Sequence, residues 1–340
     1  MRITYLFGNG LDLSFGLKTS YFDFYKFLEE KSKNDDELND NLIYKQLIKD
    51  IEDHKLDLWA DYELRLGNLT PHISIENVQK FNEDKILLDL YLREHLINEE
   101  KKLNLDKEKV PKILENSFTQ ITKCYKDEKD SKKIIALFND FRGSNMRIGA
   151  ISFNYTKTVS LLWDDNSNWN VKFKINNCPI SGYQCLLDNA FYVHGTLNDG
   201  RMVIGVDNNS QITNTDLCEN SQIHQALLKS ELLNMSGQLH LEKFKTTIDN
   251  SEMICIYGLS IGSTDSYYWK IIKQRLLRST SLLIIYQYEK NYTNIHLYYT
   301  NALIEKTKRK FYVNSNATEE EIKKINDRII VEINKKLFCV

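Results

Sequence analysis

Short apolar runs that end in glycine or small polar residues constrain the fold of this chain more than any other feature. The runs are residues 3–7, 146–153, 190–194, 202–205, 253–258 and 281–286. They are rich in β-branched residues and nearly continuous in apolar character, as expected of parallel strands covered by helices on both faces. Helical patterns lie between them, notably over 222–244 and 266–277. The sequence therefore predicts an α/β fold, doubly wound around a mostly parallel sheet.

Helical periodicity predicts one large insertion in this fold. Residues 35–139 are rich in Lys, Glu, Asp and Leu, with apolar residues spaced near 3.6 and breaks at Thr70-Pro71 and Val110-Pro111. We expect an α/β core of residues 1–34 and 140–315, with residues 35–139 inserted after the first strand–helix unit. Within 316–340, the stretch from Thr318 to Lys336 is predicted as one amphipathic C-terminal helix.

Composition excludes several classes of protein. The chain has 45 Lys and Arg against 47 Asp and Glu, so its net charge of −2 argues against bulk binding to nucleic acid. No run approaches the roughly 20 apolar residues that span a membrane, and Gly8 interrupts the apolar start where a signal peptide would continue. We expect a cytoplasmic protein without a membrane partner. The six cysteines form no Cys-x-x-Cys pair, and Cys178 and Cys185 are too loosely spaced, so no metal site is expected.

The first candidate site is Gly8-Asn9-Gly10-Leu11-Asp12, directly after the first apolar run. Ligands of such folds bind beyond the carboxyl ends of strands, where glycines let backbone amides approach a phosphate. A plain tight turn is the alternative. The fingerprint Gly-x-Gly-x-x-Gly is not matched, because residue 13 is Leu. Asp12 would repel a phosphate unless it faces a ribose or a helix N-terminus.

Two further candidates follow the next predicted strands. Phe153, Asn154 and Thr156 offer a neutral polar segment that suits a ribose or a water, although an Asx-type turn also explains it. His194 titrates near neutral pH and is the natural general base, with Gly195 leaving space for a ligand. A structural role is the alternative for this histidine.

The fourth candidate runs from Gly258 through Ser260 to Asp265, in a strand–turn–helix context. It predicts a second cradle for an anion or a ribose, while Asp265 could instead only cap the following helix. The segment also matches the serine-hydrolase pattern Gly-x-Ser-x-Gly. Only His296 follows it in the chain, so the usual order of a catalytic triad disfavours that interpretation.

Taken in order, these loops resemble those of the sirtuin-like NAD-binding fold. The matching positions are Gly8, Gly10, Asn154, His194, Gly195, Gly258 and Ser260. Asp12 and Thr156 depart from the sirtuin pattern, and the four-cysteine zinc module is missing. Over most of its length the chain is more similar to the bacterial AbiH family, which is associated with phage abortive infection. That similarity rests on the opening motif, on Trp59-x-Asp61-Tyr62-Glu63, on Phe153 to Thr156, on His194-Gly195 and on Gly258 to Asp265.

The resemblance implies an effector that cleaves NAD, or a related nucleotide, at its N-glycosidic bond. Asn154 would orient a water or the ribose, and His194 would act as general base. Glu63 would stabilise the developing cation, unless it is only a solvated residue or a salt-bridge partner. Asn9 and the amides around Gly8–Gly10 and Gly258–Ser260 would bind phosphate or ribose.

Two other functions remain open at this point. A non-enzymatic sensor would bind a nucleotide and meet a phage or host trigger protein through the helical insertion. A nuclease would need Asp12, Glu63, Asp207 and Asp265 to converge on Mg²⁺. The sequence does not decide the oligomeric state, with a homo-oligomer as one option.

Overall fold

The computed structural model describes residues 1–52, 62–121, 128–141, 145–163, 173–174, 184–198, 202–236, 239–290, 292 and 297–338. Three residues named above, Trp59, Asp61 and Cys178, lie outside these ranges, as does His296. No helix in the described ranges combines the length and the apolar character needed to cross a membrane.

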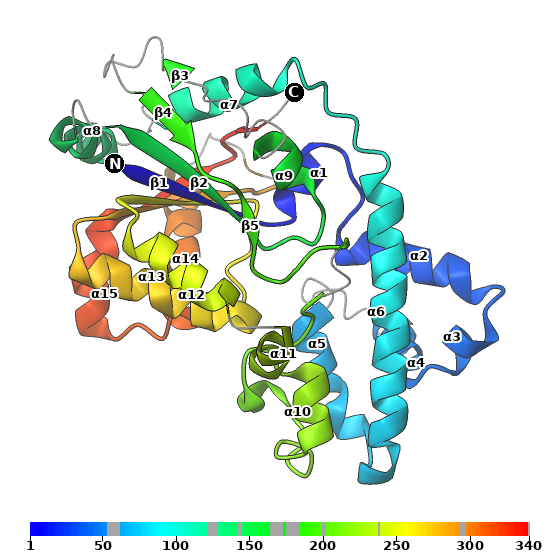
Figure 1. The fold of residues 1–340 in the computed structure, drawn as a ribbon. Coiled ribbons are helices and arrows are strands. Elements are labelled where there is room, and N and C mark those ends of the chain that lie inside the picture. The colour runs from blue at the N-terminus through cyan, green and yellow to red at the C-terminus, as the bar shows by residue number, and fades with distance from the viewer. Residues whose placement is uncertain are drawn as a thin grey trace.

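One sheet organises the described part of the chain (Figure 1). Its eight strands are β1 (Arg2–Phe7), β2 (Met146–Ser152), β3 (Phe173–Lys174), β4 (Gln184–Leu187), β5 (Phe191–Tyr192), β6 (Met253–Tyr257), β7 (Leu282–Gln287) and β8 (Ile329–Ile333). They are ordered β3-β4-β2-β1-β6-β7-β8, with β5 also paired to β2, and only the β3–β4 pair is antiparallel. From β4 to β8 this is the strand order of dinucleotide-binding folds, which confirms the predicted doubly wound α/β class.

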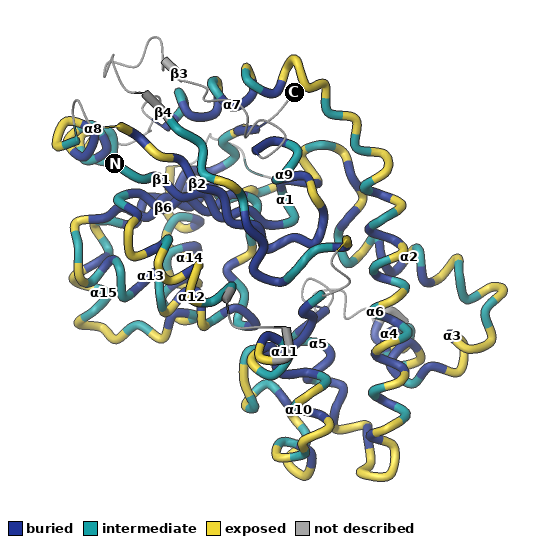
Figure 2. Tube along the Cα trace, in the orientation of Figure 1, coloured by how far each residue is buried: buried dark blue, intermediate teal, exposed yellow. Residues whose placement is uncertain are grey.

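Helices cover both faces of this sheet. Successive side chains of a strand point to opposite faces, so Tyr5 and Phe7 pack towards the helices within residues 110–163, whereas Leu6 packs towards those within residues 239–325. Figure 2 shows the strands buried between these layers. The helices are α1 (Gly10–Ser14), α2 (Tyr21–Ser32), α3 (Asp36–Asp40), α4 (Leu42–Glu52), α5 (Tyr62–Leu69), α6 (Val78–Glu100), α7 (Val110–Thr119), α8 (Glu128–Asp140), α9 (Thr158–Trp163), α10 (Ser221–Leu227), α11 (Lys229–Ser236), α12 (Leu239–Asp249), α13 (Ser266–Arg278), α14 (Leu297–Asn314) and α15 (Glu319–Ile325).

A separate apolar core forms a helical unit beside the sheet (Figure 1). It joins α2–α6 to α10 and to the loop residues between β5 and α10. The packing does not follow the predicted boundaries of the insertion at 35 and 139, since α2, predicted within the core, packs in the helical unit. Helices α7 and α8 belong to the sheet layers, and residues 197–228 belong to the helical unit. The predicted strand over 202–205 is wrong, because Ile204 lies in this second core and only Val206 makes an isolated bridge, to Leu228.

The C-terminal region also differs from its prediction. Thr318 caps α15 in a capping box with Glu321, as expected, but the helix ends at Ile325. The chain then forms β8, which pairs in parallel with β7, so the prediction of one helix through Lys336 is wrong. Beyond β8, Phe338 is fully buried among aromatic rings on the face of β1.

Candidate functional site

A cavity of about 510 Å³ lies where the carboxyl ends of β1, β2, β5 and β6 meet the helical unit. Its walls include Glu63 of α5, Leu92 and Leu96 of α6, and residues 19–22 before and within α2. Strand order reverses between β1 and β6, and this is the position where open α/β sheets bind their ligands. The volume is within the range of small-molecule sites.

Most of the residues predicted as site residues line this cavity. They are Asn9, Asp12, Glu63, Phe153, Asn154, Thr156, His194, Gly258, Ser260 and Asp265. Gly8, Gly10 and Gly195 are not among its lining residues. The cavity thus brings together the four candidate loops, which are far apart along the chain. The three glycines have another role.

Gly8 and Gly10 allow two loops to touch backbone to backbone. A Cβ on Gly8 would lie 2.4 Å from Cα of Leu259, and one on Gly10 would lie 2.5 Å from Cα of Gly258. The amide of Gly8 donates to Tyr257 O at 3.1 Å, and that of Gly10 donates to Gly258 O at 2.7 Å. Both amides are therefore already used inside the protein and are not free to donate to the phosphate or ribose that the loops around Gly8–Gly10 and Gly258–Ser260 are predicted to bind.

Asn9 and Gly195 act on the shape of the loops. The side chain of Asn9 donates to Thr19 O at 3.0 Å and accepts from the Thr19 hydroxyl, which holds residues 19–22 over the cavity. Gly195 has φ of +79°, a conformation that favours glycine, directly after His194.

Asp12 is a buried carboxylate at the floor of the cavity, with a fractional exposure of 1%. Its Oδ2 accepts a hydrogen bond of 2.7 Å from the Thr156 hydroxyl. Burial raises the pKa of Asp12 to about 6, against the lowering effect of nearby Thr158, Thr156 and Asn154. A carboxyl group with this pKa can exchange a proton near neutral pH.

Three polar atoms of the cavity residues have no hydrogen-bond partner among the described residues. They are Oδ1 of Asp12, Nδ2 of Asn154 and Nε2 of His194. Asn154 is close enough to Asp12 to lower its pKa, but Nδ2 of Asn154 and Oδ1 of Asp12 do not have the geometry of a hydrogen bond. Buried polar atoms are nearly always bonded in folded proteins, so this cluster is typical of a ligand site.

His194 is enclosed by aromatic rings and one carboxylate. Its ring lies 5.5 Å from that of Phe153 and 5.8 Å from that of Tyr268, and Nε2 is 3.2 Å from Oδ1 of Asp265. Burial, reinforced by the charge of Lys229, lowers the pKa of His194 below 6.5 despite the opposing effect of Asp265. The imidazole is therefore neutral at pH 7.

Lys229, which the sequence analysis did not identify, lies behind the cavity lining and pairs with two of its carboxylates. Its Nζ lies 2.7 Å from Oε2 of Glu63 and 2.7 Å from Oδ1 of Asp265. Asp265 makes no capping hydrogen bond at the start of α13, so capping alone does not explain it. Glu63 is buried and ion-paired, which corresponds to the salt-bridge alternative, while it also lines the cavity.

The remaining alternatives can be compared with this geometry. Ser260 is exposed and lines the cavity. Asp207 does not line it and instead accepts from the amide of Tyr267 at 3.2 Å. Within the described ranges no group of three or more His, Cys, Asp or Glu side chains could hold a metal ion, so the four carboxylates do not converge as a nuclease site would require.

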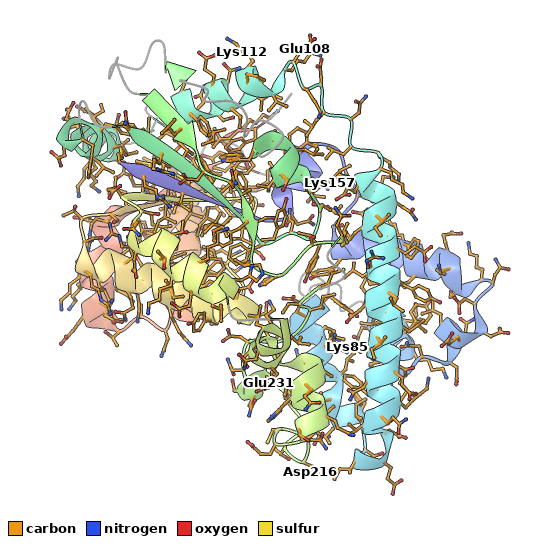
Figure 3. The ribbon with its side chains drawn as sticks, viewed as in Figure 1. Lys85, Glu108, Lys112, Lys157, Asp216 and Glu231 are labelled. Carbon is orange, nitrogen blue, oxygen red and sulfur yellow. The ribbon has the colours of Figure 1, made fainter. Side chains whose placement is uncertain are left out.

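The helical unit is attached to the sheet next to this cavity. Figure 3 shows Lys157, just after β2, beside the C-terminal end of α6. Its amide donates to Oε2 of Glu100 at 2.7 Å, and its Nζ lies 3.3 Å from Oε1 of the same residue. The cavity wall formed by α6 is thus fixed to the loop that carries Asn154.

Comparison with known proteins identifies the family. The model of the family described as "Bacteriophage abortive infection AbiH" matches residues 4–287, a range that includes every cavity residue named above. No curated protein matches the chain. The AbiH resemblance is confirmed, whereas the sirtuin-like core stays a prediction. The chain belongs to the bacteriophage abortive infection AbiH family and thus has a role in abortive-infection defence against phage.

Proposed function

We propose that this AbiH protein binds a nucleotide in the cavity and cleaves NAD, or a closely related nucleotide, at its N-glycosidic bond. The observation that carries the proposal is the pair of buried atoms without hydrogen-bond partners in the described chain, Oδ1 of Asp12 and Nδ2 of Asn154, in the same cavity as Nε2 of His194. The carboxylate oxygen accepts a hydrogen bond, the imidazole nitrogen donates or accepts one, and the amide nitrogen donates one. All three follow the carboxyl ends of strands. Ribose hydroxyls both donate and accept, so they suit such a set.

The charge of the cavity suits the nicotinamide riboside half of NAD, where the bond breaks. Three carboxylates line it, from Asp12, Glu63 and Asp265, and Lys229 is already paired with the last two. The remaining negative charge favours the cationic nicotinamide ring and an oxocarbenium-like transition state. The phosphates would then lie towards the open side, near the exposed Ser260.

In the proposed reaction, Asp12 is the group that takes the proton. A water attacks C1 of the ribose, the bond from C1 to the nicotinamide nitrogen breaks, and its electron pair neutralises the ring. The proton of the water passes to Oδ1 of Asp12, whose pKa of about 6 leaves it ionised at pH 7. Asn154 donates to a ribose hydroxyl, and neutral His194 orients a second one. We favour Asp12 over His194 as base because Nε2 of His194 faces Asp265.

Chromatography of nicotinamide and ADP-ribose tests the proposal directly. Purified protein is incubated with NAD, and cellular NAD is followed after phage infection. We expect Asp12→Asn and Asn154→Ala to lower product formation by about 100-fold or more, and His194→Ala to abolish protection. Asn104→Ala and His72→Ala, at exposed positions, serve as matched controls. Binding of NAD without products would identify a sensor, and neither binding nor NAD loss would overturn the proposal.

A further inference from the structure

A buried lysine connects the helical unit to the core at the cavity wall. Lys229 is the first residue of α11, directly after Leu228 forms an isolated bridge with Val206. Its amide donates to Val206 O at 2.9 Å, which fixes the start of the helix. Figure 1 shows α11 beside α5, the helix that carries Glu63.

The ammonium group of Lys229 bridges two carboxylates from different parts of the fold. Glu63 belongs to α5, whereas Asp265 precedes α13 on the sheet side, and each lies 2.7 Å from Nζ. The side-chain exposures of Lys229, Glu63 and Asp265 are 6%, 9% and 11%. Removing one partner of such a buried set leaves an uncompensated charge and is strongly destabilising.

The same oxygen of Asp265 that accepts from Lys229 lies next to His194. Oδ1 of Asp265 is 2.7 Å from Nζ of Lys229 and 3.2 Å from Nε2 of His194. We propose that Lys229 is the positioning residue of this cavity, because it clamps Glu63 to Asp265 and so fixes the carboxylate that faces His194. The inference deepens the proposed function but rests on contacts that exist without a ligand.

Charge balance around His194 makes this role measurable. The groups facing the imidazole are Asp265 and Lys229, and the phenols of Tyr155 and Tyr268, whose pKa values burial raises well above 10. With Lys229 present, the positive charge opposes protonation of His194. Without it, the negative charge of Asp265 acts on the imidazole unopposed and favours the imidazolium ion.

NMR titration of His194 in the full-length protein tests the proposal, with the resonance assigned through His194→Gln. In Lys229→Met we expect the midpoint of His194 to rise by about one pH unit or more. In Glu63→Gln, which leaves Lys229 less compensated, we expect it to stay at or below the wild-type midpoint. Lys229→Arg should restore the wild-type value. Lys273→Met, which breaks the 2.7 Å pair between α13 and Glu321 of α15, is the matched control.

Lys229→Met and Glu63→Gln each have an outcome that would overturn the proposal. If Lys229→Met does not fold, the direction of the shift in Glu63→Gln decides, because a rise there would overturn the proposal. A midpoint in Lys229→Met within about 0.3 pH units of wild type would equally overturn it. Failure of NAD cleavage leaves this titration unaffected, so the two proposals fail separately.

Discussion

The hydroxyl of Thr156 donates a hydrogen bond of 2.7 Å to Oδ2 of Asp12, which stands 144 positions earlier in the chain. The parallel pairing of β1 with β2 brings the two together, since Phe7 and Ser152 are partners at the carboxyl ends of these strands. The bond engages one carboxylate oxygen and leaves Oδ1 without a partner in the described residues. It therefore orients the group that we propose as the base.

Replacing this donor should change the acidity of Asp12. In Thr156→Val we expect the pKa of Asp12 to rise above 6, by up to about one unit, because a hydrogen bond to the charged form lowers a carboxyl pKa. Titration of the carboxyl ¹³C resonance measures it without a substrate. Thr246→Val, at an exposed position, is the control, and an unchanged midpoint in Thr156→Val would contradict the prediction.

Asp12 should also make stability depend on pH. Its folded-state pKa of about 6 lies above 3.8, so the folded protein binds this proton more tightly than the unfolded chain does. Protonated Asp12 therefore contributes up to about 3 kcal/mol to the free energy of unfolding at low pH. This contribution is lost as pH rises from about 4 through 6. Asp12→Asn should therefore gain stability relative to wild type across this window. Denaturant unfolding at several pH values measures this. The prediction is refuted if the free energies of unfolding of wild type and Asp12→Asn change in parallel with pH.

The close contact between the loops predicts a contrast between two glycines. Gly10→Ala should lower the free energy of unfolding by at least about 2 kcal/mol, because its Cβ would lie 2.5 Å from Cα of Gly258. Gly149→Ala should change it by less than about 1 kcal/mol, because its Cβ meets nothing closer than 3.7 Å. Urea unfolding compares the two, and equal losses would argue against the contact.

The buried C-terminal aromatic ring gives a further prediction. Phe338→Ala should cost about 3–5 kcal/mol, because the ring packs 5.2 Å from Tyr5 and 5.1 Å from Phe7. Phe22, which is 52% exposed, is the control, and Phe22→Ala should cost less than about 1 kcal/mol. Thermal unfolding distinguishes them, and similar melting temperatures would place Phe338 outside the cooperative core.

The fold and the location of the site could largely be predicted from the sequence, because parallel strands read as continuous apolar runs whose polar ends meet at one edge. The strand β8 was missed because α15 precedes it with a strong cap, and Ile329–Ile333 continues the apolar spacing that a helix would have.

The chemistry within the site was harder to predict. Lys229 looks like an ordinary helix residue, and only the distances to Glu63 and Asp265 reveal its role. The amides of Gly8 and Gly10 could bind a phosphate or a neighbouring loop, and the sequence does not contain the crossover geometry that decides between them. Partners distant in the chain carry no local signal.

The contact of Gly8 and Gly10 with Gly258 and Leu259 has a consequence for how the cavity accommodates a ligand. That seam is mostly main chain and follows two central strands, so the part of the cavity wall formed by Gly258 and Leu259 is held in place. Adjustment to a ligand's size then falls to the opposite side, where residues 19–22 and α6 face it. Specificity for the proposed nucleotide would accordingly be set by the helical unit, while the sheet side of the cavity keeps its shape.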